Sequence, residues 1–171
     1  MPLAVTLRPD RIVASAVEDM WSKLAARGMG SAPRHAPHIT LAIFPDNGPV
    51  HRIRRALART ASGVGSIPVK LHGFGLFPGP PAVLWLAPVV TPALLGLHSQ
   101  VHRALADVKA HPDTLPGAWV PHFTLAYGMA SPEHALTAVL PIWKPRTGLL
   151  EHLELLRFDP VEVLETWRLL S

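Results

Sequence analysis

Two short stretches of this sequence are nearly the same: PHITLA at residues 37–42 and PHFTLA at residues 121–126. Five of the six positions are identical, and the sixth is apolar in both copies. The offset of 84 residues is close to half of the 171-residue chain. A segment that recurs at such a spacing indicates a repeated structural unit. The sequence therefore predicts one bilobal domain over 1–171, with an internal repeat at roughly 1–88 and 89–171.

The residues around the two copies predict strands and helices in a similar order in both halves. Asp10 and Thr91 are suitable N-caps, and Pro132 suits the first turn of a helix. A turn, PDNG at 45–48, closes the first motif strand. Strands are expected at 3–8, 37–44, 67–77, 83–87, 121–126, 149–158 and 161–170, and helices at 10–27, 50–62, 91–109 and from 131 onward.

This order predicts an α+β fold with two lobes related by a pseudo-twofold axis. Each lobe is expected to hold an antiparallel-rich sheet and two helices, and a central cleft is expected to carry the two His-x-Thr motifs. Side chains alternate along a strand, so His38 and Thr40 project to one side and Ile39 projects to the other. The same alternation places His122 and Thr124 on one face. Under the pseudo-twofold axis, the two faces converge on one cleft.

Two imidazoles and two hydroxyls around one point suit a phosphodiester. Near pH 7 one histidine takes a proton from the attacking group and the other gives one to the departing oxygen. Threonine hydroxyls donate hydrogen bonds to the non-bridging oxygens. Duplication of a mere packing motif is the alternative, but apolar residues would serve packing better than His and Thr. The sequence thus predicts His38 and His122 as catalytic residues and Thr40 and Thr124 as phosphate-binding residues, with no metal.

The composition agrees with imidazole chemistry. The chain has ten histidines and no cysteine, which excludes disulfides, thiolate nucleophiles and cysteine-ligated zinc. The net charge of +4 is compatible with an anionic ligand but is far from that of a DNA-coating protein. No signal-peptide pattern begins the sequence, and prolines break its most apolar region, 83–97. We expect a cytoplasmic protein with no membrane association and no obligate protein partner.

The sequence resembles the 2H phosphoesterase superfamily, and most closely its 2′-5′ RNA ligase or RNA 2′,3′-cyclic phosphodiesterase branch. The resemblance includes both motifs, GFGLFP at 73–78, VLWL at 83–86 and the final strand. It implies hydrolysis of a 2′,3′-cyclic phosphate at an RNA end or on a nucleotide to the 2′-phosphate, without a cofactor. It assigns His38 as proton donor to the departing 3′ oxygen and His122 as proton acceptor from water. The reverse 2′-5′ ligation is expected to be minor.

One position departs from the family pattern. Many relatives carry an arginine directly after the second motif, where this chain has Tyr127. Tyrosine lacks the bidentate phosphate contact of arginine, which leaves room for a smaller nucleotide substrate. Phe77, Trp119 and Tyr127 are expected near strand ends, where they line the substrate site or pack at its rim.

Three other groups of residues have a simpler interpretation. The Arg52, Arg55 and Arg59 face of one helix is a solvated surface more often than an RNA contact. His98 and His102 have the i, i+4 spacing of a zinc pair but no evident third ligand. His35 is interpreted as a loop residue.

Two further functions remain as alternatives. One is a module that binds RNA or phosphorylated ligands without turnover, and the other is a phosphodiesterase for 2′,5′-linked oligonucleotides. The two intact histidines favour an enzyme, because binding alone would not need two titrating groups.

Overall fold

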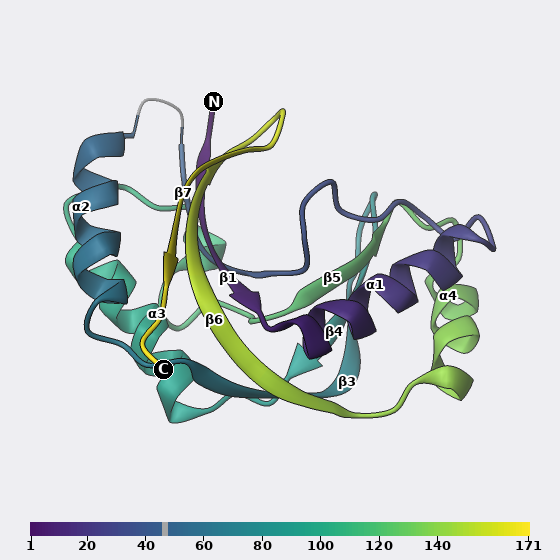
Figure 1. Ribbon diagram of the computed structural model, residues 1–171. Helices are drawn as coiled ribbons and strands as arrows, with labels where there is room; N and C mark the ends of the chain where they lie inside the picture. The colour runs from purple at the N-terminus through teal and green to yellow at the C-terminus, as the bar shows by residue number, and fades with distance from the viewer. Residues whose placement is uncertain (46–47) are drawn as a thin grey trace.

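The computed structural model describes residues 1–45 and 48–171 and has an α+β fold (Figure 1). The described residues form seven strands: β1 Leu3–Pro9, β2 Ile39–Phe44, β3 Ile67–Phe77, β4 Val83–Pro88, β5 Phe123–Tyr127, β6 Arg146–Arg157 and β7 Glu162–Arg168. Its helices are α1 Arg11–Ala25, α2 Val50–Ala61, α3 Pro92–Ala104 and α4 Pro132–Val139, with short 3₁₀ turns η1 Pro112–Thr114 and η2 Leu140–Ile142. The centre of the predicted PDNG turn lies outside the described residues.

All strands belong to a single antiparallel sheet. Its order is β2-β1-β6-β3-β4-β5, and β7 pairs with β6 beside this path. The first part of the long, curved strand β6 pairs with β3, and its second part lies between β1 and β7 (Figure 1). The predicted α+β class and antiparallel pairing are confirmed. The sequence did not predict that β6 would join the strands of both halves into one sheet.

The motif strands β2 and β5 lie at the two ends of this strand order. Each has the same irregularity, a register shift that leaves one residue without a partner on the neighbouring strand. The extra residue is Leu41 on β2 and Leu125 on β5, in both cases the residue after the motif threonine. Such bulges bend a strand and redirect its side chains, and they are common next to active sites.

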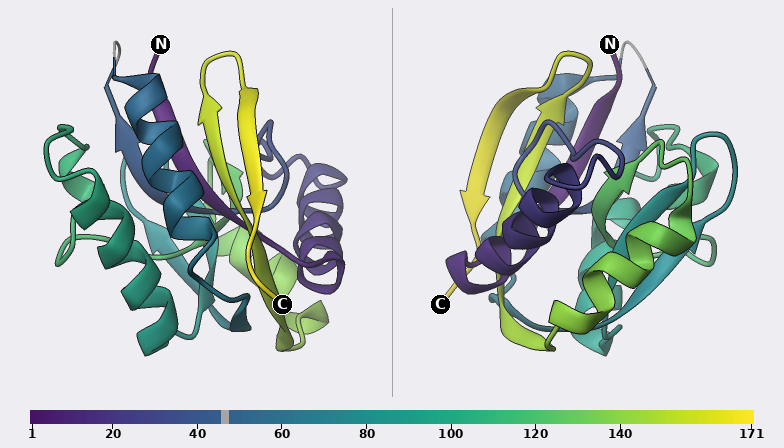
Figure 2. Two further views of the ribbon diagram at one scale, coloured as in Figure 1. Left: turned by 60° about the vertical axis from the view of Figure 1, so that its left-hand side comes forward. Right: turned by 90° about the vertical axis from the view of Figure 1, so that its right-hand side faces the viewer.

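The helices form two pairs, each with one helix from either half of the chain. Helix α1 packs beside α4 against β5 and β4, and α2 packs beside α3 against β7 and β2. Figure 2 shows the α2–α3 pair in its left view and the α1–α4 pair in its right view. Each end of the sheet is therefore covered by one helix from the first half of the chain and one from the second.

The apolar residues within the motifs anchor both motif strands in the core. Ile39, Leu41, Phe123 and Leu125 are fully buried. The histidines and threonines between them remain half-buried. The alternation predicted from the sequence is thus confirmed on both strands.

One helix is shorter than predicted. Thr91 caps α3 as expected, since its hydroxyl accepts a hydrogen bond from the Leu94 amide. The helix ends at Ala104 rather than near residue 109, because Leu105 leaves the helical conformation (φ −123°) and is buried in the core. In the described part of the chain, no helix is long and apolar enough to cross a membrane. The cytoplasmic location stays a prediction.

The side chain of Asp10 connects α1 to β6. Its Oδ1 accepts a hydrogen bond from the Val13 amide at 2.9 Å and caps the helix, and its Oδ2 accepts one from the Leu149 amide at 2.7 Å. We predict that Asp10→Ala lowers the free energy of unfolding by about 2 kcal/mol, because it removes a helix cap and a second bond to a backbone amide. Urea denaturation measures this loss. Asp19→Ala, which removes an exposed carboxylate from the same helix, is the control and should change little. Equal effects of the two substitutions would contradict the capping role.

Candidate active site

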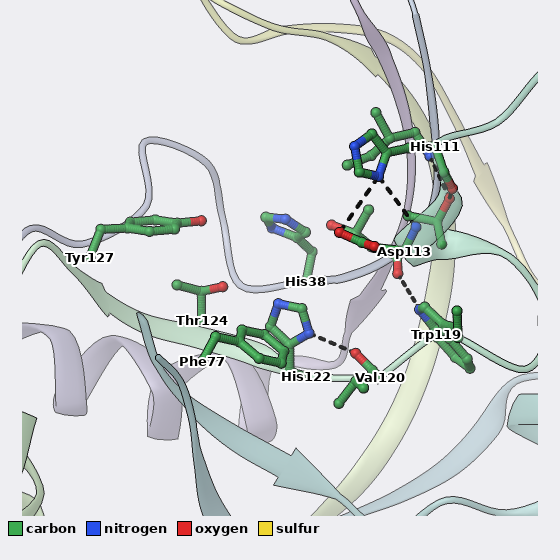
Figure 3. A pocket seen from close by; sticks show the side chains of 13 residues that line it. His38, Phe77, His111, Asp113, Trp119, Val120, His122, Thr124 and Tyr127 are labelled. Carbon is green, nitrogen blue, oxygen red and sulfur yellow. Dashed lines mark hydrogen bonds and ion pairs between the residues drawn. The ribbon is translucent and has the colours of Figure 1, made fainter. Parts of the chain in front are cut away.

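A hollow of about 470 Å³ lies between the two motif strands (Figure 3). All seven residues that the sequence analysis placed at the site contribute to its lining: His38, Thr40, Phe77, Trp119, His122, Thr124 and Tyr127. The structure therefore brings together side chains from β2, β5, the end of β3 and the segments directly before β2 and β5. The two strands begin at Ile39 and Phe123, so each motif histidine lies one residue before its strand rather than within it as predicted. The segment around η1 adds His111, Asp113, Thr114 and Ala118, which the sequence analysis had treated only as a loop.

The two motif histidines are held in the same way. The Nδ1 atom of His38 lies 2.7 Å from the Ala36 carbonyl oxygen, and Nδ1 of His122 lies 2.7 Å from the Val120 carbonyl oxygen. A carbonyl oxygen only accepts hydrogen bonds, so Nδ1 must carry the proton in both rings. In the neutral rings Nε2 is then the basic nitrogen, and it is the one left for the hollow.

The two rings differ in their neighbours. His122 packs edge-on to Phe77, with 4.9 Å between ring centres, and lies 5.8 Å from Trp85. His38 has another imidazole beside it, that of His35, with 5.2 Å between ring centres. Apolar aromatic rings bury His122 and carry no charge, whereas a second imidazole beside His38 opposes its protonation when that imidazole is charged. Identical backbone positions thus give the two histidines different electrostatic surroundings.

Burial lowers the pKa of both catalytic candidates. The pKa of His38 falls to about 4, chiefly through burial, although its hydrogen bond to Ala36 works in the opposite direction. Burial also lowers the pKa of His122, again opposed by the bond to Val120. Both rings are therefore neutral at pH 7 in the free cleft. An anion bound between them would raise both pKa values, because it stabilises the imidazolium form.

A tryptophan supports each motif strand from behind. The indole Nε1–H of Trp119 donates to the backbone carbonyl of Thr40 at 2.8 Å. The indole of Trp21, on α1, donates to the carbonyl of Thr124 at 2.9 Å. These bonds fix the backbone at the residues whose hydroxyls line the hollow, so the correspondence between the two halves extends beyond the motifs. The sequence analysis did not foresee a role for Trp21.

Two histidines on α3, His98 and His102, help to hold Trp119 and β2 in place. The His98 ring stacks flat on Trp119, with 3.9 Å between ring centres and 4° between planes, and its Nε2 bonds to the Thr114 carbonyl. His102 Nε2 bonds to the Leu41 carbonyl on β2 at 3.1 Å. Within residues 1–45 and 48–171, no group of three or more His, Asp or Glu side chains is arranged to hold a metal ion. His98 and His102 thus pack and form hydrogen bonds next to the cleft.

The other predicted lining residues occupy distinct places. Phe77 lies against His122 and Trp85 and so packs behind the catalytic ring as well as lining the hollow. Tyr127 is 41% exposed at the rim, and Figure 3 shows its hydroxyl directed toward His38. Its phenol is thus placed to contact a ligand.

The arginines of α2 do not contribute to the lining of the hollow in the described part of the chain. Arg52 forms an ion pair with Asp107, and Arg54 forms one with Glu165. Arg55 and Arg59 are exposed on the helix surface.

The structure also shows a feature that the sequence analysis missed. His35, interpreted as a loop residue, bonds through Nε2 to the buried carboxylate of Glu154 at 3.0 Å. A sequence signal for it existed, since Glu154 is the one charged residue within the apolar run LELL at 153–156. An ionisable group in such a run needs a partner when it is buried.

The buried His98 gives a prediction about stability. Burial lowers its pKa from 6.5 to about 4, so the unfolded chain binds a proton there at a higher pH than the folded chain does. The free energy of unfolding should therefore fall by about 1 to 2 kcal/mol between pH 7 and pH 5. His98→Phe keeps a ring against Trp119 but cannot titrate, and urea midpoints at the two pH values should show a smaller pH dependence for it. An unchanged dependence would mean that other groups cause the effect.

Comparison with known proteins agrees with this geometry. A sequence profile described as the 2′-5′ RNA ligase superfamily matches residues 9–162. TT0787 of Thermus thermophilus has a similar structure (TM-score 0.68, 24% identity), with 99% of this chain and 98% of that chain covered. Escherichia coli LigT complexed with 3′-AMP is similar too (TM-score 0.66, 16% identity; 99% and 97% covered).

A more distant likeness is to Kluyveromyces marxianus Usb1 (TM-score 0.54, 13% identity), with 98% of both chains covered. No curated protein matches the sequence. The profile match spans most of the chain, and the structural likenesses show the same fold over nearly its full length. The protein therefore belongs to the 2′-5′ RNA ligase superfamily, a group of 2H phosphoesterases.

Proposed function

We propose that the protein hydrolyses 2′,3′-cyclic phosphates, at RNA ends or on nucleotides, to the 2′-phosphate. The observation that carries this proposal is the matched pair of histidines, His38 and His122. Each has Nδ1 bound to a backbone carbonyl, which leaves Nε2 for the same hollow. A general base and a general acid on opposite sides of phosphorus are what the reaction needs.

The reaction balances with these groups alone. One imidazole takes a proton from water as the water oxygen bonds to phosphorus. The second imidazole enters the step as an imidazolium, because the bound anion has raised its pKa. The bond from phosphorus to the 3′ oxygen then breaks, and this ring protonates that oxygen from Nε2. Hydroxyls of Thr40 and Thr124 donate hydrogen bonds to the non-bridging oxygens, where charge develops. The products are a 2′-phosphate and a free 3′-hydroxyl. The same ring opening with a 5′-hydroxyl in place of water forms a 2′-5′ phosphodiester, and this gives the minor 2′-5′ ligation, the reverse of cleavage of such a bond.

The size of the hollow supports a nucleotide substrate. Its volume of about 470 Å³ lies within the range of sites that hold small organic ligands. Escherichia coli LigT, which shares the fold, has been crystallised with 3′-AMP and with ATP. Tyr127 at the rim supplies a ring and a hydroxyl for the nucleoside part. The partner we propose is therefore an RNA end or a nucleotide that carries a cyclic phosphate.

Two alternatives differ from this proposal in how they use the two histidines and in the length of the ligand. A binding module without turnover would have no need for two titrating imidazoles with free Nε2 atoms. A phosphodiesterase for 2′,5′-linked oligonucleotides would use the same catalytic pair on a longer substrate. A panel of 2′,3′-cyclic mononucleotides, an oligoribonucleotide with a cyclic phosphate end and 2′,5′-linked oligoadenylate separates the three by their products.

Substitution of either catalytic histidine tests the mechanism. We expect His38→Ala and His122→Ala each to lower kcat roughly 10²- to 10⁴-fold on a 2′,3′-cyclic mononucleotide, because each removes a proton-transfer group. Hydrolysis should continue in EDTA, and chromatography should identify a 2′-phosphate product. His72→Ala, which removes an exposed histidine on β3, is the matched control and should keep the wild-type rate. Near wild-type rates in both motif variants would exclude the paired-histidine mechanism.

The assignment of acid and base needs a separate experiment. The resemblance makes His38 the proton donor, whereas its stronger burial and its neighbour His35 oppose protonation. At His122 burial is the cause that lowers the pKa, whereas at His38 the charges of His35 and His122 add to it. When the surroundings of two like titratable groups push their pKa values apart, the group with the higher pKa usually acts as the acid and the other as the base.

A substrate with sulfur in place of the departing 3′ oxygen distinguishes the two assignments. A thiolate leaves without protonation, because a thiol is far more acidic than an alcohol. Sulfur should thus restore activity to the variant that lacks the acid and leave the variant without the base inactive. From the surroundings of the rings we expect the rescue in His122→Ala, measured as kcat on the sulfur substrate relative to the oxygen substrate. Rescue of His38→Ala would support the assignment from the resemblance instead.

A further inference from the structure

The proposed substrate is an anion, yet its cleft has little positive charge. None of the described residues that line the hollow is lysine or arginine. Tyr127 occupies the position at which the family pattern has an arginine. Both motif histidines are neutral in the free cleft, so a positive group already present beside them would help to attract the phosphate.

His35 is placed to be that group. Its ring lies 5.2 Å from the His38 ring, and its side chain is 12% exposed. A second hollow, of about 230 Å³, opens on this side of His38. His38, Thr40 and Tyr127 line both hollows, and His35 lines the second. A ligand bound at the motif residues is therefore within reach of His35.

The charge around His35 depends on the buried carboxylate of Glu154. This residue is 1% exposed and accepts hydrogen bonds from Arg8, His35 and Thr166 at 3.0–3.1 Å. Burial by itself would raise the Glu154 pKa, but the bonds and charges of His35 and Arg8 lower it below its ordinary value. Glu154 is thus ionised at neutral pH. Because Arg8 balances that charge, protonation of His35 leaves the cluster with a net positive charge.

The hydrogen bonds also locate the protons on His35. A carboxylate only accepts, so Nε2 of His35 carries the proton that is shared with Glu154. In the part of the chain that the structure describes, Nδ1 of His35 has no hydrogen-bond partner. In the imidazolium form this second nitrogen is a free donor beside the cleft.

We propose that His35 is a third substrate-binding histidine, whose imidazolium, held by Glu154, donates its Nδ1–H to a non-bridging oxygen of the substrate phosphate from the His38 side. This inference rests on the proposed function for the identity of the anion. It gives the cleft the positive charge that Tyr127 does not supply. The groups that surround His35 and take part in its titration are Glu154 on β6, Arg8 on β1, Tyr127 on β5, and Arg34 and His38 in its own segment.

Sulfate is the probe, because its charge is constant between pH 5.5 and pH 8, unlike that of phosphate. Calorimetry measures its affinity for the wild type and for His35→Ala and His35→Gln across this range. We expect about tenfold weaker binding at pH 5.5 in both variants, through loss of a charge-assisted hydrogen bond. The wild-type affinity should fall as pH rises. The variants should show a weaker dependence, because only the part that comes from His38 and His122 remains. Arg55→Ala, which removes an exposed positive charge on α2, is the control.

Two readouts separate a direct contact from a structural effect. The NMR signals of the His122 ring should be the same in both His35 variants as in the wild type. The urea midpoint should be kept in His35→Gln, whose amide can still donate to Glu154, and should fall in His35→Ala, which leaves the buried carboxylate one partner short. Wild-type sulfate affinity in both variants would overturn the proposal, and so would a loss that comes with altered His122 signals. Failure of the proposed function has a different signature. The protein would then hydrolyse no cyclic phosphate, whereas the effect of His35 on sulfate binding would remain.

Discussion

The site depends on the pairing of β6 with both β1 and β3. Because one curved strand is shared, the two halves form a single sheet whose ends are the motif strands β2 and β5. An end strand keeps one backbone edge without a ladder partner. In this protein indole N–H groups of Trp119 and Trp21 bind backbone carbonyls of the two motif threonines. The sheet ends are thereby made rigid without being covered, which lets their side chains face a ligand.

The two motifs place two like imidazoles at one hollow, whereas the proposed hydrolysis needs two unequal ones. The backbone around the two histidines is the same. In each copy Nδ1 is bonded to the carbonyl two residues earlier, and a bulge follows the motif threonine. The difference between the two histidines comes from neighbouring residues outside the two six-residue motifs. Aromatic rings surround His122, and an ionisable cluster that ends in Glu154 lies beside His38. The repeated unit therefore sets the geometry, and residues particular to each half set the protonation.

Much of this could be predicted from the sequence, because the evidence for it is local. Alternation within six residues was enough to predict that His38, Thr40, His122 and Thr124 reach one hollow, although each histidine lies one residue before its strand begins. Capping residues and turns located most helix and strand ends to within two residues. The larger differences were α3, which ends at Ala104 before the buried Leu105, and β6, which begins at Arg146 rather than 149. The contacts that escaped prediction are long-range. The bond from His35 to Glu154 spans 119 residues, and the one from Trp21 to Thr124 spans 103. A pattern of neighbouring residues in the sequence does not indicate which distant residues come into contact when the strands pair.

The shared strand also fixes the order in which the chain can fold. During synthesis β1 and β3 leave the ribosome long before residues 146–157, the strand that lies between them. Until then their facing edges have no partner, and α1 lacks α4, the helix beside which it packs. Unpaired strand edges invite association with other chains, and such long-range pairing is slow. The two halves carry copies of one motif, but the nascent chain cannot join the β2–β1 part of the sheet to the β3–β4–β5 part until nearly all of it has been made.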